Sequence, residues 1–189
     1  MKKTIFNSAL IVLVTLTGAS FTTLSEKAVN IKDSKITWKG YKVTGEHEGT
    51  INIKQGNLTF ADHQLTGGTF VIDMSSITVT DLEGEYKGKL EGHLKSADFF
   101  GVENHPTASF KITKVEGKDT NLKVTGNLTI KNITNPITFD MIVTESSATA
   151  NLKVDRSKFD VRYGSTSFFD GLKDKAIYDE FDLNVNLKF

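Results

Sequence analysis

Apolar and polar residues alternate with a period of two along most of the chain from residue 36 onward. Successive side chains of a β-strand point to opposite faces, so this alternation predicts strands with one apolar and one polar face. The clearest example is the final segment, whose apolar positions are Phe181, Leu183, Val185, Leu187 and Phe189. The same alternation marks residues 36–38, 70–74, 110–112, 122–130, 137–143 and 152–154.

Strands that are apolar on one face only are typical of antiparallel sheets, because parallel strands are usually covered on both faces. Turn-forming residues separate the strands at 61–64, 116–119, 131–136 and 145–147. Residues 51–53 and 58–60 predict a shorter pair of strands around Gln55-Gly56-Asn57. About eight strands with short links indicate an all-β barrel or sandwich. A closed barrel has the advantage that it leaves no free strand edge.

One segment has helical rather than strand periodicity. Its apolar residues are Leu82, Tyr86, Leu90, Leu94 and Ala97, and charged residues stand between them. This spacing predicts one amphipathic helix over residues 82–97, lying across an end of the sheet. Glycines at 84, 88 and 92 would form a bare stripe that allows close packing on another backbone. Each of them costs the helix about 1 kcal/mol relative to alanine.

Residues 94–110 connect this helix to the next strand and contain two adjacent phenylalanines, Phe99 and Phe100. Neighbouring residues of a strand face opposite sides, so both rings cannot reach the core from within a strand. We therefore expect the pair in a turn packed over the end of the sheet. The turn would be a lid over a cavity or a loop that closes a solid core. A second irregular region, residues 156–179, contains another such pair, Phe168 and Phe169.

The first twenty residues have the pattern of a secretory signal peptide. Lys2 and Lys3 precede an apolar run from Ile5 to Leu16, and small residues follow at 18–20. The run is too short to span a bilayer. We expect removal of residues 1–20, a leader segment over 21–35 and a single domain over 36–189. The expected location is the periplasm or the medium, and no cysteine is available for lipid attachment.

The composition of the chain excludes several classes of partner and of catalytic site. The chain has 23 basic and 23 acidic residues without a basic cluster, so a nucleic-acid partner is not expected. It has no cysteine, which excludes thiol chemistry and thiolate metal sites. The four histidines fit no zinc motif, and no nucleophile or phosphate-binding motif is present. We therefore predict no catalytic residues, no metal and no cofactor. An enzyme acting on an isoprenoid lipid, with His93, Asp98 and His105 as its polar cluster, remains an alternative.

The function class that these exclusions leave is the binding of an apolar ligand inside the barrel. A barrel of about eight strands is either filled by its inward side chains or holds one slender ligand. Periodicity leaves both alternatives open. Strands of nine residues span about 30 Å, which suits a long hydrocarbon better than a compact metabolite.

Several blocks of sequence resemble the YceI-like family. The first is Lys95-Ser96-Ala97-Asp98-Phe99-Phe100 followed by His105-Pro106-Thr107-Ala108-Ser109-Phe110. The second is Val124-Thr125-Gly126-Asn127-Leu128-Thr129-Ile130-Lys131 with Asn135-Pro136-Ile137-Thr138-Phe139. The third is Asp155-Arg156-Ser157-Lys158-Phe159 with Val161-Arg162-Tyr163-Gly164. The resemblance covers residues 36–189, and the chain departs from it only at the turn Asn132-Ile133-Thr134.

The resemblance implies a lipocalin-like antiparallel barrel that is exported and binds a long isoprenoid, a quinone tail or a fatty amide inside. No enzymatic activity is established for the family, and the resemblance does not fix the ligand head group. The sequence therefore favours a carrier or storage protein that does not span the membrane, with a homodimer left open. A solid-cored stress or interaction module is a further alternative. The residues expected to line the cavity or its mouth are Trp38, Phe70, Ile72, Leu94, Phe99, Phe100, Phe110, Ile112, Phe139, Met141, Phe168 and Phe169.

Overall fold

The computed structural model describes residues 23–189, so the predicted signal peptide over residues 1–20 lies outside the described part. Nine strands and one α-helix make up this part, together with two short 3₁₀ turns. The strands are β1 (Leu24–Ala28), β2 (Lys35–Lys42), β3 (Gly45–Ala61), β4 (Gln64–Val79), β5 (Thr107–Lys118), β6 (Asn121–Ile130), β7 (Ile133–Val143), β8 (Ser147–Asp155) and β9 (Ile177–Lys188). The helix is α1 (Gly84–Lys95), and the 3₁₀ turns are η1 (Arg156–Phe159) and η2 (Lys173–Lys175).

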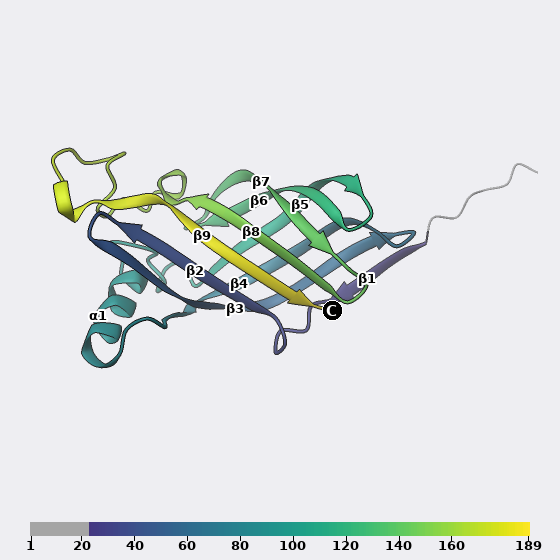
Figure 1. Cartoon of the computed structure of the whole chain (residues 1–189), viewed down its shortest axis with the longest axis horizontal. Helices are drawn as coiled ribbons and strands as arrows, with labels where there is room; N and C mark the ends of the chain where they lie inside the picture. Colours follow the sequence, from purple (N-terminus) through teal and green to yellow (C-terminus); the bar gives the residue numbers. More distant parts are fainter. Residues whose placement is uncertain (1–22) are drawn as a thin grey trace, which may run out of the picture.

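Strands β2 to β9 form a closed antiparallel barrel of eight strands, which confirms the predicted fold class. Each strand pairs with the next along the chain, and β9 returns to pair with β2, with Val185 opposite Ile36. The remaining strand, β1, lies within the predicted leader segment and pairs with the last residues of β3 outside this ring. Figure 1 shows a long barrel with α1 at one end and β1 with the C-terminus at the other.

The structure corrects the expected break at Gln55-Gly56-Asn57, because β3 runs without interruption from Gly45 to Ala61. Ile53 pairs with Ile72 and Gln55 with Val71, so β3 has one extra residue at this point. Such a β-bulge shifts the side-chain alternation by one position. The inward side therefore changes from odd positions before the bulge to even positions after it. In the sequence this change of parity has the same appearance as a turn.

The helix α1 lies across one end of the barrel, as predicted, but only part of its apolar stripe is buried (Figure 1). Leu94 is buried, whereas the side chain of Tyr86 is 73% exposed. The carboxylate of Glu91 accepts a hydrogen bond from the backbone N–H of Val79 at 2.9 Å and so ties α1 to the end of β4. Within residues 23–189 no helix is long and apolar enough to cross a membrane.

The glycine stripe of α1 does not pack on another backbone, contrary to the expectation. A Cβ atom added at Gly84, Gly88 or Gly92 would meet nothing within 4 Å. The helix contacts β4 through a different face, so the glycines face open space.

Candidate ligand cavity

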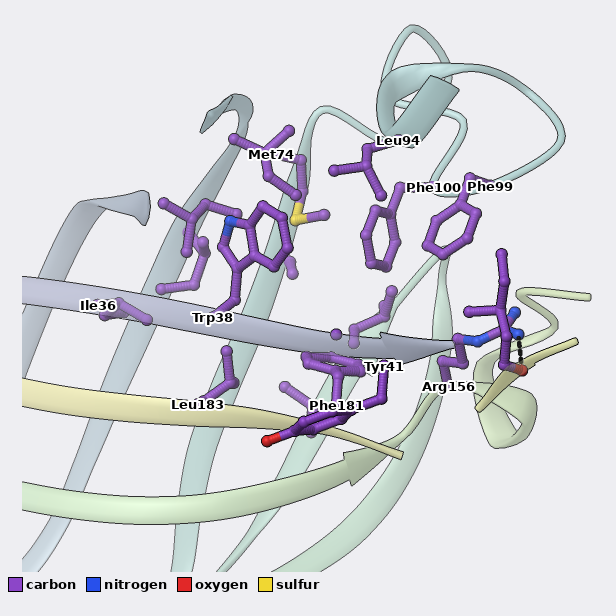
Figure 2. A pocket seen from close by; sticks show the side chains of 18 of the residues that line it. Ile36, Trp38, Tyr41, Met74, Leu94, Phe99, Phe100, Arg156, Phe181 and Leu183 are labelled. Carbon is purple, nitrogen blue, oxygen red and sulfur yellow. Dashed lines mark hydrogen bonds between the residues drawn. The ribbon is translucent and has the colours of Figure 1, made fainter. Parts of the chain in front are cut away.

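Two adjacent cavities lie inside the barrel, with volumes of about 130 and 100 Å³. Figure 2 shows the first, which lies at the α1 end between β2, β9 and the turn that follows the helix. The second lies farther along the barrel and is lined by apolar side chains alone. Four residues line both cavities and separate them: Ile36, Ile72, Leu128 and Leu183. The interior is therefore neither a solid core nor one open tube.

Nine of the twelve predicted site residues line these cavities. The first cavity contains Trp38, Ile72, Leu94, Phe99 and Phe100. The second contains Phe70, Ile72, Phe110, Phe139 and Met141. Ile112 is buried in the core but lines neither cavity, because its side chain packs toward Gly68. Whether these residues contact a ligand stays a prediction.

The pair Phe168 and Phe169 does not line either cavity, which corrects the expected position of these rings. Their side chains are 39% and 49% exposed. Both backbone N–H groups donate to the carbonyl of the fully buried Ser165, and this turn holds the pair on the outer surface. The ring of Phe168 packs there against the guanidinium of Arg162, with 5.1 Å from Cζ to the ring centroid.

The pair Phe99 and Phe100 forms the end wall of the first cavity (Figure 2). Both rings are buried and meet edge to face, with their centroids 5.0 Å apart. A tight turn holds them, in which the N–H of Gly101 donates to the carbonyl of Ser96 at 2.7 Å. Gly101 has a φ of +58°, a conformation that side chains disfavour. The chain thus places both rings over the barrel end without a strand.

Gly40 is an inward-facing residue of β2 that the sequence analysis missed. It pairs with Phe181 and lines the first cavity, yet a Cβ atom added there would meet nothing within 4 Å. Other inward glycines are covered by neighbouring groups. A Cβ at Gly49 would meet the Thr78 carbonyl oxygen and lie 2.6 Å from Cζ2 of Trp38, and one at Gly56 would lie 2.8 Å from Cδ1 of Phe70. The missing side chain at Gly40 therefore helps to leave the first cavity empty. The alternation of Ile36 and Trp38 would have placed residue 40 inward.

Arg156 was also missed as a site residue, although it belongs to one of the blocks that resemble the family. It lines the first cavity and is 2% exposed. Its guanidinium donates to the backbone carbonyls of Tyr178, Val161 and Ile177. The ring of Phe99 covers it, with 5.3 Å from Cζ to the ring centroid. Burial lowers the pKa of the Arg156 guanidinium, and the nearby Asp179 and Asp155 carboxylates oppose this effect.

The polar cluster considered for an enzyme does not form a connected set in the described chain. The ring of His93 lies between Phe99 and Tyr163, at centroid distances of 5.5 and 4.4 Å. Burial lowers the pKa of His93, and the charge of Asp98 opposes this shift. Nε2 of His93 and Nδ1 of His105 are buried without a hydrogen-bond partner among residues 23–189. Over the same residues, no group of three or more histidine, aspartate or glutamate side chains is arranged to hold a metal.

Comparison with known proteins finds curated relatives that align with a short part of the chain. A UPF0312 protein of Pseudomonas aeruginosa is 44% identical over 46 residues, which is 24% of this chain and 24% of that protein. The aligned region thus spans about a quarter of the length of the curated relatives that the chain matches.

Solved structures match over most of the barrel. The crystal structure of BcnA from Burkholderia cenocepacia has a TM-score of 0.65 at 21% identity, covering 85% of this chain and 99% of BcnA. A polyisoprenoid-binding domain from Saccharophagus degradans, implicated in plant cell wall breakdown, has a TM-score of 0.61 at 11% identity, with 88% and 98% coverage. At these identities the similarity shows the fold. The YceI-like domain matches residues 27–189, and the chain therefore belongs to the YceI-like domain family.

Proposed function

We propose that this protein binds a long apolar ligand inside its barrel and carries or stores it in the cell envelope without catalysis. One observation carries the proposal: a closed barrel encloses two largely apolar cavities that share four aliphatic side chains in their linings. Protein interiors are normally packed to crystal density, with few voids larger than a water molecule. Two cavities of this size in line therefore support a binding role over a solid-cored module.

The size of the cavities supports a ligand that enters by rearranging side chains. An apolar cavity of about 150 Å³ takes up one benzene molecule. Each cavity here is of that order, so a long chain requires that Ile36, Ile72, Leu128 and Leu183 change rotamers and join the two. Each methylene buried contributes about 0.8 kcal/mol. A chain of ten or so carbons would thus offset a substantial rearrangement.

The similarity to a polyisoprenoid-binding domain supports an isoprenoid, quinone or fatty-acyl chain as the ligand. Location in the periplasm or outside the cell, which the predicted signal peptide suggests, is part of the proposal.

A glycine substitution tests the proposal directly. Gly40→Leu adds a side chain to the first cavity, at a position without a positive φ. Gly67→Leu is the matched control, because Gly67 pairs with Thr59 on the outer face of the barrel. Trp38 is the single tryptophan of the chain and lines the first cavity, so its fluorescence reports occupancy. Titration with a ten-carbon alkylbenzene should change this fluorescence in the wild type and in Gly67→Leu, but at least tenfold more weakly in Gly40→Leu.

Mass spectrometry of an organic extract of the protein, purified from its own host, provides the second test. We expect a copurified lipid in the wild type and less of it in Gly40→Leu. Equal alkylbenzene binding by Gly40→Leu and the wild type, or no binding by either, would refute a ligand in this barrel.

A further inference from the structure

Exposed aromatic side chains gather at one end of the barrel. Within residues 23–189 five aromatic side chains are exposed, and all five belong to segments at the α1 end. They are Tyr86 on α1, Tyr163, Phe168 and Phe169 between η1 and β9, and Tyr178 at the start of β9. Figure 1 shows that the segment between η1 and β9 projects beyond the barrel at this end. Apolar side chains that cluster on the surface of a folded protein mark a site where a protein or a membrane binds.

The projecting segment is anchored to the barrel behind its two phenylalanines. Ser165 is fully buried, and its Oγ accepts a hydrogen bond from the N–H of Ser167 at 3.1 Å. The hydroxyl of Ser167 in turn donates to Oδ2 of Asp179 on β9 at 2.6 Å. The rings of Phe168 and Phe169 are therefore held at the surface by a backbone whose base is fixed.

The exposed rings are continuous with the end wall of the first cavity. Phe169 and Tyr163 line one cleft on the outer surface. The ring of Tyr163 packs on His93, with the centroids 4.4 Å apart, and His93 packs on Phe99 at 5.5 Å. Phe99 lines the first cavity. The aromatic surface thus lies directly outside the groups that close the barrel at this end.

The area of the cluster is too small for a stable interface with a second copy of the chain. The side chains of Tyr163, Phe168 and Phe169 are between 39% and 49% exposed. An aromatic side chain buries roughly 150–250 Å² when it is fully removed from water, so the three supply roughly 300 Å². A stable protein interface needs about 800 Å² on each partner. Rings on a projecting segment suit insertion into the boundary of a lipid bilayer, where aromatic residues are enriched.

The charge of the segment indicates which property of a lipid surface it would bind. Residues 160–175 contain three basic and three acidic residues. Arg162 forms an ion pair with Asp160, and its guanidinium packs on the ring of Phe168. Attraction to anionic lipid, which comes from an excess of basic residues, is therefore small. Binding would depend on burial of the rings.

We infer that the segment between η1 and β9 docks the protein on a lipid bilayer by inserting Phe168 and Phe169, so that the α1 end of the barrel faces the membrane. The choice of a membrane over a protein partner rests on the proposed function, because a carrier of an apolar ligand exchanges it with a lipid phase. Docking itself requires no ligand in the barrel, so lipid-free protein serves for its test.

Cosedimentation with phosphatidylcholine vesicles measures docking. The variant that combines Phe168→Ser with Phe169→Ser should bind the vesicles at least tenfold more weakly than the wild type, because it loses both inserted rings. Ile142→Thr is the matched control, since Ile142 is 51% exposed at the far end of β7, and it should bind as the wild type does. Replacing a third of the lipid with phosphatidylglycerol should change wild-type binding by less than about threefold.

A fluorescence measurement covers the case in which the double variant alters the fold of the segment. Phe169→Trp places an indole on the projecting segment, and phosphatidylcholine with brominated acyl chains should quench its emission on docking. In the wild type, Trp38 is the single tryptophan and lines the first cavity, so its emission should change little with the same vesicles.

The assays separate docking from ligand binding. No vesicle binding by the wild type, equal binding by the double variant, or no quenching in Phe169→Trp would overturn membrane docking. Alkylbenzene binding that persists in these proteins would leave the proposed function in place. Self-association of the wild type that the double variant abolishes, measured by light scattering, would assign the rings to a second copy and also overturn the inference.

Discussion

The ring of Phe110 occupies the space where Gly126 lacks a side chain. Phe110 is on β5 and Gly126 is on β6, and a Cβ atom at Gly126 would lie 2.5 Å from Cε2 of the ring and 2.6 Å from the carbonyl oxygen of Lys111. Gly40 is also inward-facing, but no ring covers it. The barrel thus contains inward glycines whose space is filled by neighbouring groups, such as Gly126, and one, Gly40, that is left open to the first cavity.

Gly126→Ala should destabilise the protein by about 1–3 kcal/mol, because a methyl group there forces Phe110 and the backbone of Lys111 to move. Chemical denaturation measures this change in the free energy of unfolding. Gly67 lies on the outer face, where an added Cβ atom would be 3.7 Å from its nearest neighbour, Cβ of Thr59. Gly67→Ala should therefore change the free energy of unfolding by less than about 0.5 kcal/mol. Equal effects of the two substitutions would contradict the packing described for Phe110.

Gly40→Leu should stabilise the ligand-free protein by about 1 kcal/mol or more, since the added side chain is buried in space that is otherwise empty. The melting temperature of lipid-free protein measures the effect. A lower melting temperature would show that the first cavity cannot accept a side chain at this position.

Gly88→Ala and Gly92→Ala should each stabilise α1 by about 1 kcal/mol. Both positions face open space, so the methyl group meets no neighbour. Gly84→Ala is the contrasting variant, because Gly84 has a φ of +56° and alanine would be strained there. In thermal denaturation, Gly88→Ala and Gly92→Ala should therefore raise the melting temperature, whereas Gly84→Ala should lower it. A loss of stability in Gly88→Ala would indicate that the glycine face packs on a partner.

Phe99→Ala should cost about 3–5 kcal/mol, the usual range for truncating a buried phenylalanine. Its ring contacts Phe100, His93 and the guanidinium of Arg156. Phe168→Ala is the matched control, since this ring is 39% exposed and lines neither cavity. Urea denaturation should show little change for Phe168→Ala, and alkylbenzene binding should be unaffected in that variant.

Stability should fall between about pH 7 and pH 5 because of His93. Burial lowers its pKa in the folded protein below the ordinary value of 6.5, so the unfolded chain binds more protons as the pH falls through this window. The contribution of His93 is therefore complete above pH 6.5 and decreases as its unfolded form becomes protonated. His93→Phe keeps an aromatic ring and should flatten the pH dependence measured by urea denaturation. His63→Asn, at an exposed turn, is the control and should leave the slope unchanged.

The carboxyl groups whose pKa is lowered below 3.8, such as Asp73 and Asp182, affect stability only at more acidic pH. They lose their contribution as the pH falls through their folded-state pKa, which lies below the window from pH 7 to 5. An unchanged slope in His93→Phe would show that another group titrates there.

The alternation of residues determined most of the architecture by itself. It was sufficient for an antiparallel all-β barrel or sandwich and for six of the twelve predicted site residues, because side-chain direction in a regular strand follows position parity. These six are Trp38, Phe70, Ile72, Phe110, Phe139 and Met141. The same rule failed at residues 53–58, where a bulge changes the parity and the sequence pattern is that of a turn. It also could not distinguish Phe99 and Phe100 from Phe168 and Phe169, since both pairs lie outside strands.

Only the tertiary structure decided which inward positions are filled. Whether a glycine leaves space depends on the residue across the strand or across the barrel: Trp38 covers Gly49, whereas no side chain covers Gly40. Likewise, the burial of Arg156 at the end of the first cavity follows from carbonyl groups of Ile177 and Tyr178, which are some twenty residues away in the sequence. Local periodicity specifies the direction of a side chain, but the volume enclosed is a property of many residues that meet only when the barrel closes.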